Sequence, residues 1–551
     1  MTVTEAPRDV VETAAAETEP STPTGLAALV GSGDPRAVGQ LFVGTSLLFL
    51  LVSGVTGVLT GFEQVDTTKF EVVGSDSFLQ LYTLHTISGL FLVVLPLLLG
   101  LATAVVPLQV GASTLAFPRL SAAGYWVYLV SGGLIVAAYA VNGGPFGGDS
   151  EGVALFLAAM VALLMALCAA TLSVVTTVIA LRAPGMSLRR TPLFSWSMLV
   201  GGSVWLLMLP VLAGMLALAY IDYTYGQRFL ATGSGDIYPR LRWVFWPPTL
   251  FAAAIPALGI IGDIVPVFAQ TRHRQHRAAL FLIGLFGALS FGAWTQLGVS
   301  GAQLESLTPW LDSEVWTVVC TAAVVPLLGL LLLWTATLQA GRPKLFSPLV
   351  LAFPAGALLL GGVAAGAASA HTTLDLFDTT WTSGAAYAVL LGTLLAAFAG
   401  LVFWAPKLYG ALVPEGVGQL VALLFSLGTL VVAVAYGIAG VLDQPTFTTP
   451  PDGLDDIDTI ELLNLVAAIA GVIVVLAGLL FILGLLRAGL GRSRRRPVAD
   501  DPWSGNTLEW ATSSPPPVGN FAELPEITSE APVYDARHRA ARAQLGTEAA
   551  S

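Results

Sequence analysis

Long apolar runs recur along this chain of 551 residues and restrict its fold more than any other feature. Each run holds about 20 or more mostly apolar residues, the length that a helix needs to cross a bilayer. Lipid cannot hydrogen-bond an open backbone and the runs show no strand alternation, so helices are expected. With 55% hydrophobic and 11% charged residues, a single water-soluble core is excluded. The sequence predicts an all-α polytopic membrane protein with twelve transmembrane helices, at approximately residues 41–62, 82–107, 122–143, 151–182, 192–221, 243–270, 278–301, 314–338, 346–370, 382–405, 414–442 and 460–487.

The chain divides into three predicted segments. Residues 1–37 are rich in Glu, Thr, Pro and Ala, so we expect a disordered tail with no cleaved signal peptide. Residues 38–489 form the predicted membrane domain, and residues 490–551 form a C-terminal tail. Arginine and lysine gather in alternate loops, and by the positive-inside rule both tails are predicted to be cytoplasmic. These loop residues are Arg119, Arg182, Arg189, Arg190, Arg272, Arg274, Arg277, Arg342, Lys344 and Lys407.

His85 is the one histidine that falls well inside an apolar span. An imidazole in hydrocarbon needs a hydrogen-bond partner, a proton acceptor or a metal, because leaving it unpaired costs several kcal/mol. We therefore treat His85 as the candidate site residue. A neutral histidine bonded to a neighbouring helix is the alternative interpretation.

The remaining polar features have simpler interpretations. Cys168 and Cys320 lie inside apolar spans with no metal-ligand spacing, which is typical of small core residues. His273 and His276 belong to a basic loop and are expected to be solvated. His371 is expected at a wet membrane interface, and the acids of residues 452–458 in a solvated loop.

Several motifs carry a family resemblance that hydropathy alone cannot explain. They are VPLQVGASTLAFPRL after the second span, LRAPGMSL with TPLFSW at 181–196, ALGIIGDIVPVF at 257–268, PPDGLDDIDTI before the last span, and DPWSGNTLEWATSSPPPVGNFAELP in the tail. The chain resembles subunit I of the haem-copper oxidases, the family of cytochrome c oxidase. The resemblance implies a twelve-helix fold that holds a low-spin haem, an oxygen-binding haem and a copper ion. It also implies the plasma membrane of a bacterium.

Most of the family's haem ligands are missing. His85 lies eleven residues before Pro96, the spacing of the first axial ligand of the low-spin haem. The family's HFH triplet, which supplies the second axial ligand and the ligand of the oxygen-binding haem, corresponds to Gly384, Ala385 and Ala386. None of these three side chains can bind iron. His85 is therefore the only candidate haem ligand that the resemblance leaves.

The copper site is missing as well. The family's HPEVY motif reads WPPTL here, with Trp246, Pro248 and Leu250 at the positions of its copper histidine, carboxylate and tyrosine. The family's His-His pair falls on Thr295 and Gln296. Copper needs imidazole or thiolate donors, so no copper and no catalytic or metal-binding residue is predicted.

Proton-carrying and propionate-binding positions also differ from the family. Polar and charged side chains that carry protons or hold haem propionates in the family are replaced by residues that cannot do so. The replacements are Leu330, Thr103, Thr114, Asp443, Gln444 and Gly61.

Two functions remain open. The first is a catalytically inactive subunit I-like protein that acts as a structural, assembly or interaction subunit. Its expected partners are the lipid bilayer and other respiratory oxidase subunits, and no nucleic-acid partner is expected. The second is an electron-transfer protein with one haem on His85 and water, Met or Tyr387 opposite. The missing ligands oppose an active terminal oxidase subunit.

The space that absent cofactors would leave must be filled, because unfilled volume costs roughly 24 cal/mol per Å³. Trp246, Trp294 and Trp381 stand near the former ligand positions. We expect a mostly collapsed pore that these indoles fill, with any remaining cavity apolar and near His85. The alternative is that a lipid or quinone occupies the gap.

Overall fold

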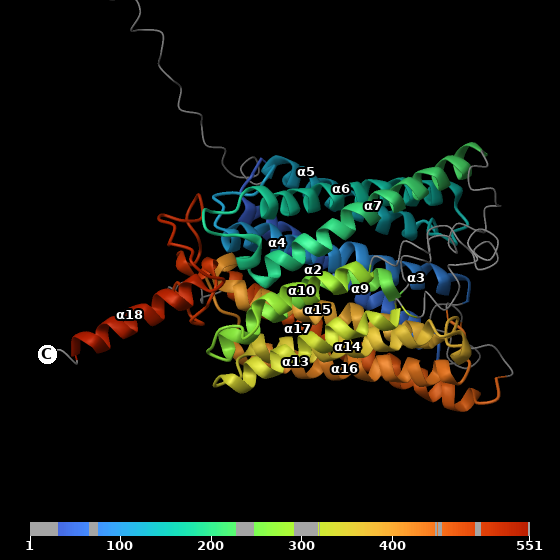
Figure 1. The fold of residues 1–551 in the computed structure, drawn as a ribbon. Coiled ribbons are helices and arrows are strands. Elements are labelled where there is room, and N and C mark those ends of the chain that lie inside the picture. Colours follow the sequence, from blue (N-terminus) through green and yellow to red (C-terminus); the bar gives the residue numbers. More distant parts are fainter. Residues whose placement is uncertain are drawn as a thin grey trace, which may run out of the picture.

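A computed structural model describes residues 31–65, 75–226, 247–290, 318, 320–446, 449, 454–490 and 498–548 (Figure 1). Within these ranges the chain is helical and contains no strand. The long helices are α2 (Pro35–Glu63), α3 (Ser75–Ile87), α4 (Leu95–Val110), α5 (Pro118–Ala140), α6 (Ser150–Ala180), α7 (Leu193–Tyr225), α9 (Pro247–Phe268), α10 (His276–Ser290), α13 (Val324–Ala340), α14 (Ser347–Ser369), α15 (Thr380–Tyr409), α16 (Glu415–Val441), α17 (Ile457–Leu490) and α18 (Pro532–Glu548). Shorter helices are η2 (Ser88–Val94), η3 (Leu188–Arg190), η7 (Thr372–Leu374) and η9 (Leu508–Ala511).

The predicted all-α polytopic fold is confirmed, and its span count is close. In the described part of the chain, 11 helices are long and apolar enough to cross a membrane, with α3, η2 and α4 joined into one span. The predicted span at 278–301 is represented by the shorter apolar helix α10. The second half of that span, from residue 291, lies outside the described residues.

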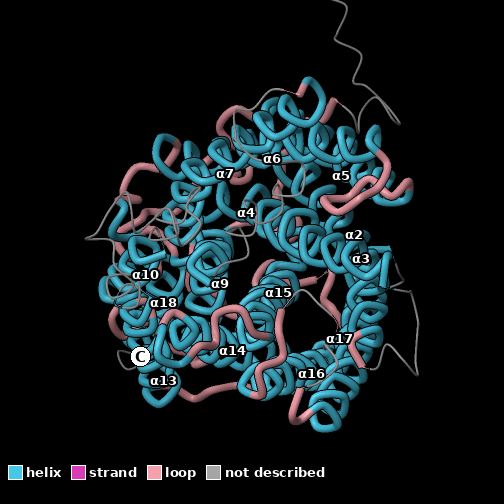
Figure 2. The backbone as a smooth tube through the Cα atoms, turned by 90° about the vertical axis from the view of Figure 1, so that its right-hand side faces the viewer, coloured by secondary structure: helices cyan, strands magenta, loops and turns pink. Residues whose placement is uncertain are grey.

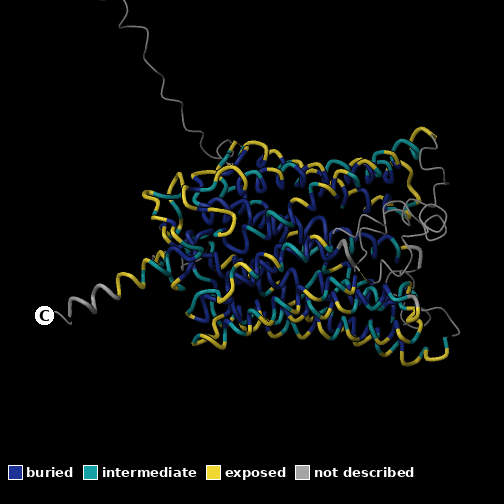
Figure 3. The backbone as a smooth tube through the Cα atoms, viewed as in Figure 1, coloured by how far each residue is buried: buried dark blue, intermediate teal, exposed yellow. Residues whose placement is uncertain are grey.

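Three helices form the centre of the bundle. Viewed along its axis, α4, α9 and α15 lie inside a ring of the other spans (Figure 2). The most apolar windows of these spans are 94%, 100% and 89% buried, whereas those of the surrounding helices are 33–56% buried. The outer helices expose many leucine and valine side chains. Figure 3 shows exposed positions along the length of these helices, and a bilayer is the solvent that suits such an apolar surface.

A seven-residue π-helix, η2, interrupts the second span and begins three residues after His85. Pro96 has no backbone N–H, so the carbonyl of Leu92 loses its usual helical partner. The hydroxyl of Tyr128 on α5 donates to that carbonyl at 2.7 Å. The irregular turn is therefore satisfied by a neighbouring helix, and π-turns of this kind often mark functional positions.

The C-terminal segment, residues 498–548, packs against one end of the bundle. The indole of Trp503 donates to the carbonyl of Phe403, and the amide of Asn520 donates to the carbonyl of Ala112. The ammonium of Lys407, fully buried at the end of α15, donates to the carbonyl of Thr512 at 2.6 Å. Arg190 also donates to the carbonyl of Ile527, and Asn506 donates to the carbonyl of Thr271. The loops after α4, α6 and α9 and the end of α15 therefore all contact this segment.

Candidate functional site

His85 lies in the last turn of α3 and faces α2 and α15. Its ring packs against Gly57 of α2, where an added Cβ would come within 2.4 Å of the ring atom Cε1. A residue larger than glycine at position 57 would therefore displace the imidazole. Part of the ring surface remains bare and faces two cavities.

Hydrogen bonds occupy both ring nitrogens of His85. Its Nδ1 lies 2.7 Å from the carbonyl oxygen of Ser53, and its Nε2 lies 3.0 Å from the hydroxyl of Tyr387 on α15. A carbonyl oxygen can only accept, so Nδ1 carries the proton and donates it. Nε2 is then the acceptor, and Tyr387 is the donor. This arrangement satisfies a neutral imidazole completely.

Tyr387 also contacts a second group of polar side chains, which includes Tyr436 and Gln64. Its ring stacks on Tyr436 of α16, with ring centroids 5.7 Å apart and planes inclined by 15°. The hydroxyl of Tyr436 donates to the side-chain carbonyl of Gln64 at 2.9 Å, and Asn464 donates to the backbone carbonyl of Gln64 at 2.8 Å. Polar side chains thus extend from His85 to the end of α2, but the step from Tyr387 to Tyr436 is an aromatic stack.

Two small cavities flank the pair of His85 and Tyr387. One, of about 100 Å³, lies toward Leu250 and Ala386; the other, of about 90 Å³, lies toward Gly61. Both are lined mostly by apolar side chains. The expectation of apolar cavities near His85 is therefore confirmed.

The residues around His85 do not fit a haem. Two donors that bind one metal at about 2.0 Å each stand about 4 Å apart, whereas Nε2 of His85 and the Tyr387 hydroxyl are 3.0 Å apart. An engineered cavity of about 150 Å³ holds only a benzene-sized molecule, so a porphyrin exceeds either space. Gly61 and Gln444 at the expected propionate positions offer no positive charge.

The former ligand positions on α15 differ from one another. At Gly384 an added Cβ would lie 2.5 Å from the carbonyl oxygen of Ala433, so the two backbones of α15 and α16 touch there. Ala386 instead lines the larger cavity beside His85. A histidine could therefore be accommodated at position 386 and not at 384.

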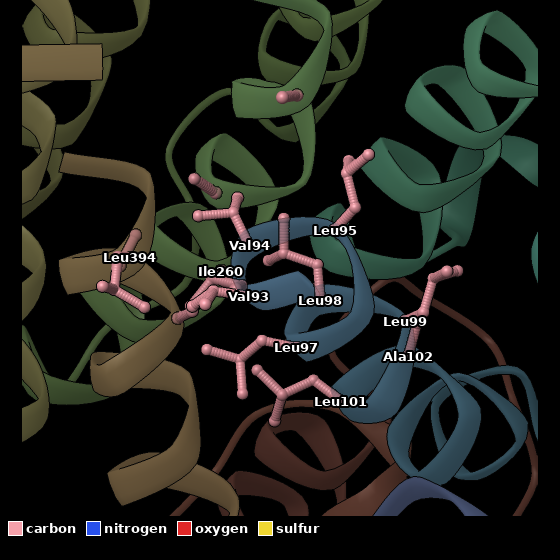
Figure 4. Close-up of a cluster of buried hydrophobic side chains, with 14 of the residues drawn as sticks. Val93, Val94, Leu95, Leu97, Leu98, Leu99, Leu101, Ala102, Ile260 and Leu394 are labelled. Carbon is pink, nitrogen blue, oxygen red and sulfur yellow. The ribbon is translucent and has the colours of Figure 1, made fainter. Parts of the chain in front are cut away.

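Aliphatic side chains fill the space between the central helices. Figure 4 shows this cluster, in which Val93, Leu97, Leu101, Ile260 and Leu394 are labelled. The structure tests the predicted filling of the pore by indoles only at Trp381. The other residues of that prediction, Trp246, Trp294, Thr295 and Gln296, lie outside the described residues. Trp381 does not fill the pore: its indole donates to the carbonyl of Ala365 on α14 at 2.7 Å. The larger branched side chains, rather than this indole, occupy the described interior.

A second buried polar group was not predicted from the sequence. We call it the carboxylate cluster, and it consists of Gln109, Ser195, Asp263, Trp404 and Glu509. Asp263 accepts from the backbone N–H groups of Leu193 and Phe194 at 2.9 and 3.1 Å, which caps the positive end of α7. The signal in the sequence that could have identified this cluster is the carboxylate of Asp263, which lies inside an apolar span.

Glu509 brings the C-terminal segment into the carboxylate cluster. Its Oε1 accepts from the amide of Gln109 at 3.2 Å and from the indole of Trp404 at 3.1 Å. Burial raises the pKa of the Glu509 carboxyl, and its hydrogen bonds to Trp404 and Gln109 partly offset this. Among the described residues, its second oxygen has no partner. The cluster ties η9 to α4 and α15, so its role is structural.

The other histidines are less solvated than predicted. His273 and His276 are half-buried, and both ring nitrogens of His273 are covered without a hydrogen-bond partner in the described part of the chain. The reason is that the C-terminal segment lies over this loop, where Arg272 pairs with Glu530 and Asp535 at 3.1 and 3.2 Å. His371 contacts Thr321 at an exposed position.

Metal-binding side chains do not gather elsewhere in the described residues, where no group of three His, Cys, Asp or Glu side chains is close enough to hold an ion. The two cysteines are buried and unpaired. The arrangement around His85 can accept and donate hydrogen bonds, but it offers no open coordination position.

Comparisons with known proteins agree with this fold. Residues 37–473 match the family model described as "Cytochrome C and Quinol oxidase polypeptide I". The chain is 30% identical over 534 residues to the probable cytochrome c oxidase subunit 1-beta of Nocardia farcinica, covering 93% of this chain and 88% of the relative. It is 28% identical to cytochrome c oxidase subunit 1 of Bacillus subtilis, covering 91% and 82%. A solved heme-copper terminal oxidase dimer is similar with a TM-score of 0.63 at 15% identity, covering 84% of this chain and 86% of that one.

Proposed function

Because this chain belongs to the cytochrome c and quinol oxidase polypeptide I family yet departs from it at the haem and copper positions, we propose that it is a catalytically inactive member. It is a multi-pass protein of the plasma membrane. In this proposal it serves as a structural, assembly or interaction subunit beside other subunits of an aerobic respiratory complex.

One observation carries this proposal. The only histidine at a family ligand position has both ring nitrogens engaged, one by the Ser53 carbonyl and one by the Tyr387 hydroxyl. Iron binding at His85 would require breaking the bond to Tyr387 and enlarging a cavity of about 100 Å³. Reductive oxygen cleavage needs an open coordination position on iron, which no described residue supports.

The orientation is also a proposal. The basic loops at 182–190, 272–277 and 342–344 lie at the same end as the C-terminal segment, which supports a cytoplasmic C-terminus by the positive-inside rule. The twelve predicted spans, an even number, then place the N-terminal segment, predicted as residues 1–37, on the same side. The membrane domain is proposed to cover residues 38–489 and the C-terminal tail residues 490–551.

The test uses the purified full-length chain. We expect no reduced-minus-oxidised haem band, no stoichiometric copper and no cyanide-sensitive oxygen uptake. We also expect the chain to co-purify with an oxidase whose own catalytic subunit is intact, and its deletion to lower the amount of that complex. Cyanide-sensitive oxygen uptake by the isolated chain would overturn the proposal.

A second function has one observation in its favour. The bare ring surface of His85 faces two cavities, and displacement of Tyr387 would free Nε2 for a single haem. An electron-transfer protein would then show a haem band that His85→Ala abolishes and the matched control His371→Ala leaves unchanged. A colourless preparation of the unmodified chain excludes this function.

A further inference from the structure

The loop between α9 and α10 borders a strongly basic hollow that the proposed function does not use. The hollow, of about 710 Å³, opens at the end of the bundle where the C-terminal segment packs. Side chains that line it include four arginines, two histidines and one carboxylate, namely Arg189, Arg190, Arg274, Arg277, His273, His276 and Glu530.

The described part of the chain does not neutralise the positive charge of this basic hollow. Its single carboxylate, Glu530, is already paired with Arg272 at 3.1 Å. Within the described residues, none of the four lining arginines pairs with a carboxylate; Arg190 donates to the carbonyl of Gly185 at 2.9 Å. An anion is therefore the ligand that this hollow would attract, and guanidinium groups suit the two oxygens of a phosphate.

An apolar groove of about 500 Å³ adjoins the basic hollow. It runs between α7 and α10 on the outer surface of the bundle, with Trp196, Phe281 and Gly284 among its lining residues. The indole of Trp196 forms its floor and donates to the carbonyl of Leu280 at 2.9 Å, while Phe281 is 67% exposed. From Arg277 to Ala288 the groove follows α10 for about 16 Å, from the end of the bundle into the region of the membrane core.

Arg189 and Arg277 line both the basic hollow and the apolar groove. The two spaces are thus parts of one amphipathic site, with cationic groups at the membrane surface and an apolar channel leading inward. A free phosphate would fill only the first part, and an apolar helix would leave the arginines unpaired. A phospholipid with a net negative headgroup complements both parts.

We propose that this site binds an anionic phospholipid, with its headgroup phosphate between Arg189 and Arg277 and an acyl chain along α10. Basic pockets at the cytoplasmic ends of transmembrane helices recognise such headgroups. The bound lipid would hold the α7–α10 pair against the C-terminal segment.

The experiment measures phosphatidylglycerol binding to the delipidated full-length protein by native mass spectrometry, with phosphatidylcholine as the reference lipid. We expect preferential binding of phosphatidylglycerol. Arg189→Gln with Arg277→Gln should weaken it about 25-fold, since each arginine near a membrane surface contributes about fivefold. The matched control Arg119→Gln, another exposed arginine, should change it by less than about twofold.

The apolar groove is tested separately. Gly284→Phe fills the groove, because an added Cβ there meets only Trp196 at 3.9 Å. It should weaken phosphatidylglycerol binding at least as much as loss of one arginine. Gly214→Phe is the matched control, since Gly214 of α7 has nothing within 4 Å of an added Cβ.

Three results would overturn the lipid site: equal binding of the two lipids, unchanged binding in the double arginine variant, or unchanged binding in Gly284→Phe. Competition by inorganic phosphate as effective as that of the lipid would indicate a free-anion site instead and also overturn it. Should the double arginine variant fail to fold, the Gly284→Phe and Gly214→Phe pair still decides.

Discussion

Two buried polar groups, both on central helices, show different degrees of packing. The carboxylate cluster joins five segments of the chain, α4, α7, α9, α15 and η9, through hydrogen bonds of 2.6–3.2 Å, and it is enclosed by the C-terminal segment. The pair of His85 and Tyr387 has its hydrogen bonds but lies between two cavities. The first group comes from the motifs that resemble the oxidase family, whereas the second is surrounded by positions that depart from it. The resemblance to the oxidase family is therefore carried by residues that hold distant segments of the chain together.

Loss of the carboxylate cluster should produce the largest effect. Asp263→Ala leaves the N–H groups of Leu193 and Phe194 without their acceptor and removes one of the two acceptors of the Gln109 amide, at a cost of about 3–5 kcal/mol in the free energy of unfolding. Thermal or denaturant unfolding in detergent measures this. Asp455→Ala, at an exposed carboxylate, is the control and should cost less than about 0.5 kcal/mol. Equal effects of the two variants would contradict the structural role of the cluster.

Restoring histidine on α15 separates the two former ligand positions. Gly384→His drives a side chain into the carbonyl of Ala433 and should destabilise the protein by about 1–3 kcal/mol. Ala386→His enters the cavity beside His85 and should cost less than about 1 kcal/mol. The two variants are compared by unfolding and by visible spectroscopy, with no haem band expected for either. If Gly384→His is the better tolerated, the close contact of α15 and α16 is wrong.

Removing the Tyr387 hydroxyl should have a smaller effect. Tyr387→Phe leaves Nε2 of His85 without a donor and should lower the free energy of unfolding by about 1 kcal/mol. A double-mutant cycle with His85→Ala measures the coupling between the two side chains. Additive effects, with no coupling energy, would show that they do not interact.

The smallest expected signal is a change in the pH dependence of stability, because a single carboxyl group contributes at most one proton. Burial raises the pKa of Glu509 in the folded protein above its ordinary value of 4.5. The folded state therefore binds the proton more tightly, and stability falls as the pH rises from about 4.5 through the folded-state pKa. Glu509→Gln should flatten this slope, measured by unfolding at a series of pH values from the ordinary pKa of 4.5 upward. Asp263 and Lys407 lie near Glu509. If Glu509→Gln leaves the slope of stability against pH unchanged, the titrating group is one of these two residues and not Glu509.

The sequence predicted the membrane fold and the position of His85 because each depends on local chemistry. An apolar run specifies a spanning helix wherever it occurs, and a lone imidazole in such a run needs a partner. The identity of that partner required the structure, since Ser53 and Tyr387 are brought to His85 from α2 and α15.

Contacts between residues far apart in the sequence could not be predicted in the same way. Gln109 and Glu509 are 400 residues apart in the chain, and no periodicity relates them. Lys407 was interpreted as a loop cation, but carbonyls of the C-terminal segment surround it. His273 and His276 were misjudged for the same reason, because the segment that covers them is distant in sequence.

The packing of Glu509 against α4 and α15 has a consequence for biosynthesis. Asp263 enters the membrane long before Glu509 is made, by roughly ten seconds to a minute at synthesis rates of about 5–20 residues per second. During that interval the end of the bundle lacks the C-terminal segment, which encloses Gln109 and Asp263. A ribosome that stalls before residue 509 therefore leaves a fully inserted protein whose central helices are not yet locked together, and only the last tenth of the chain completes the fold.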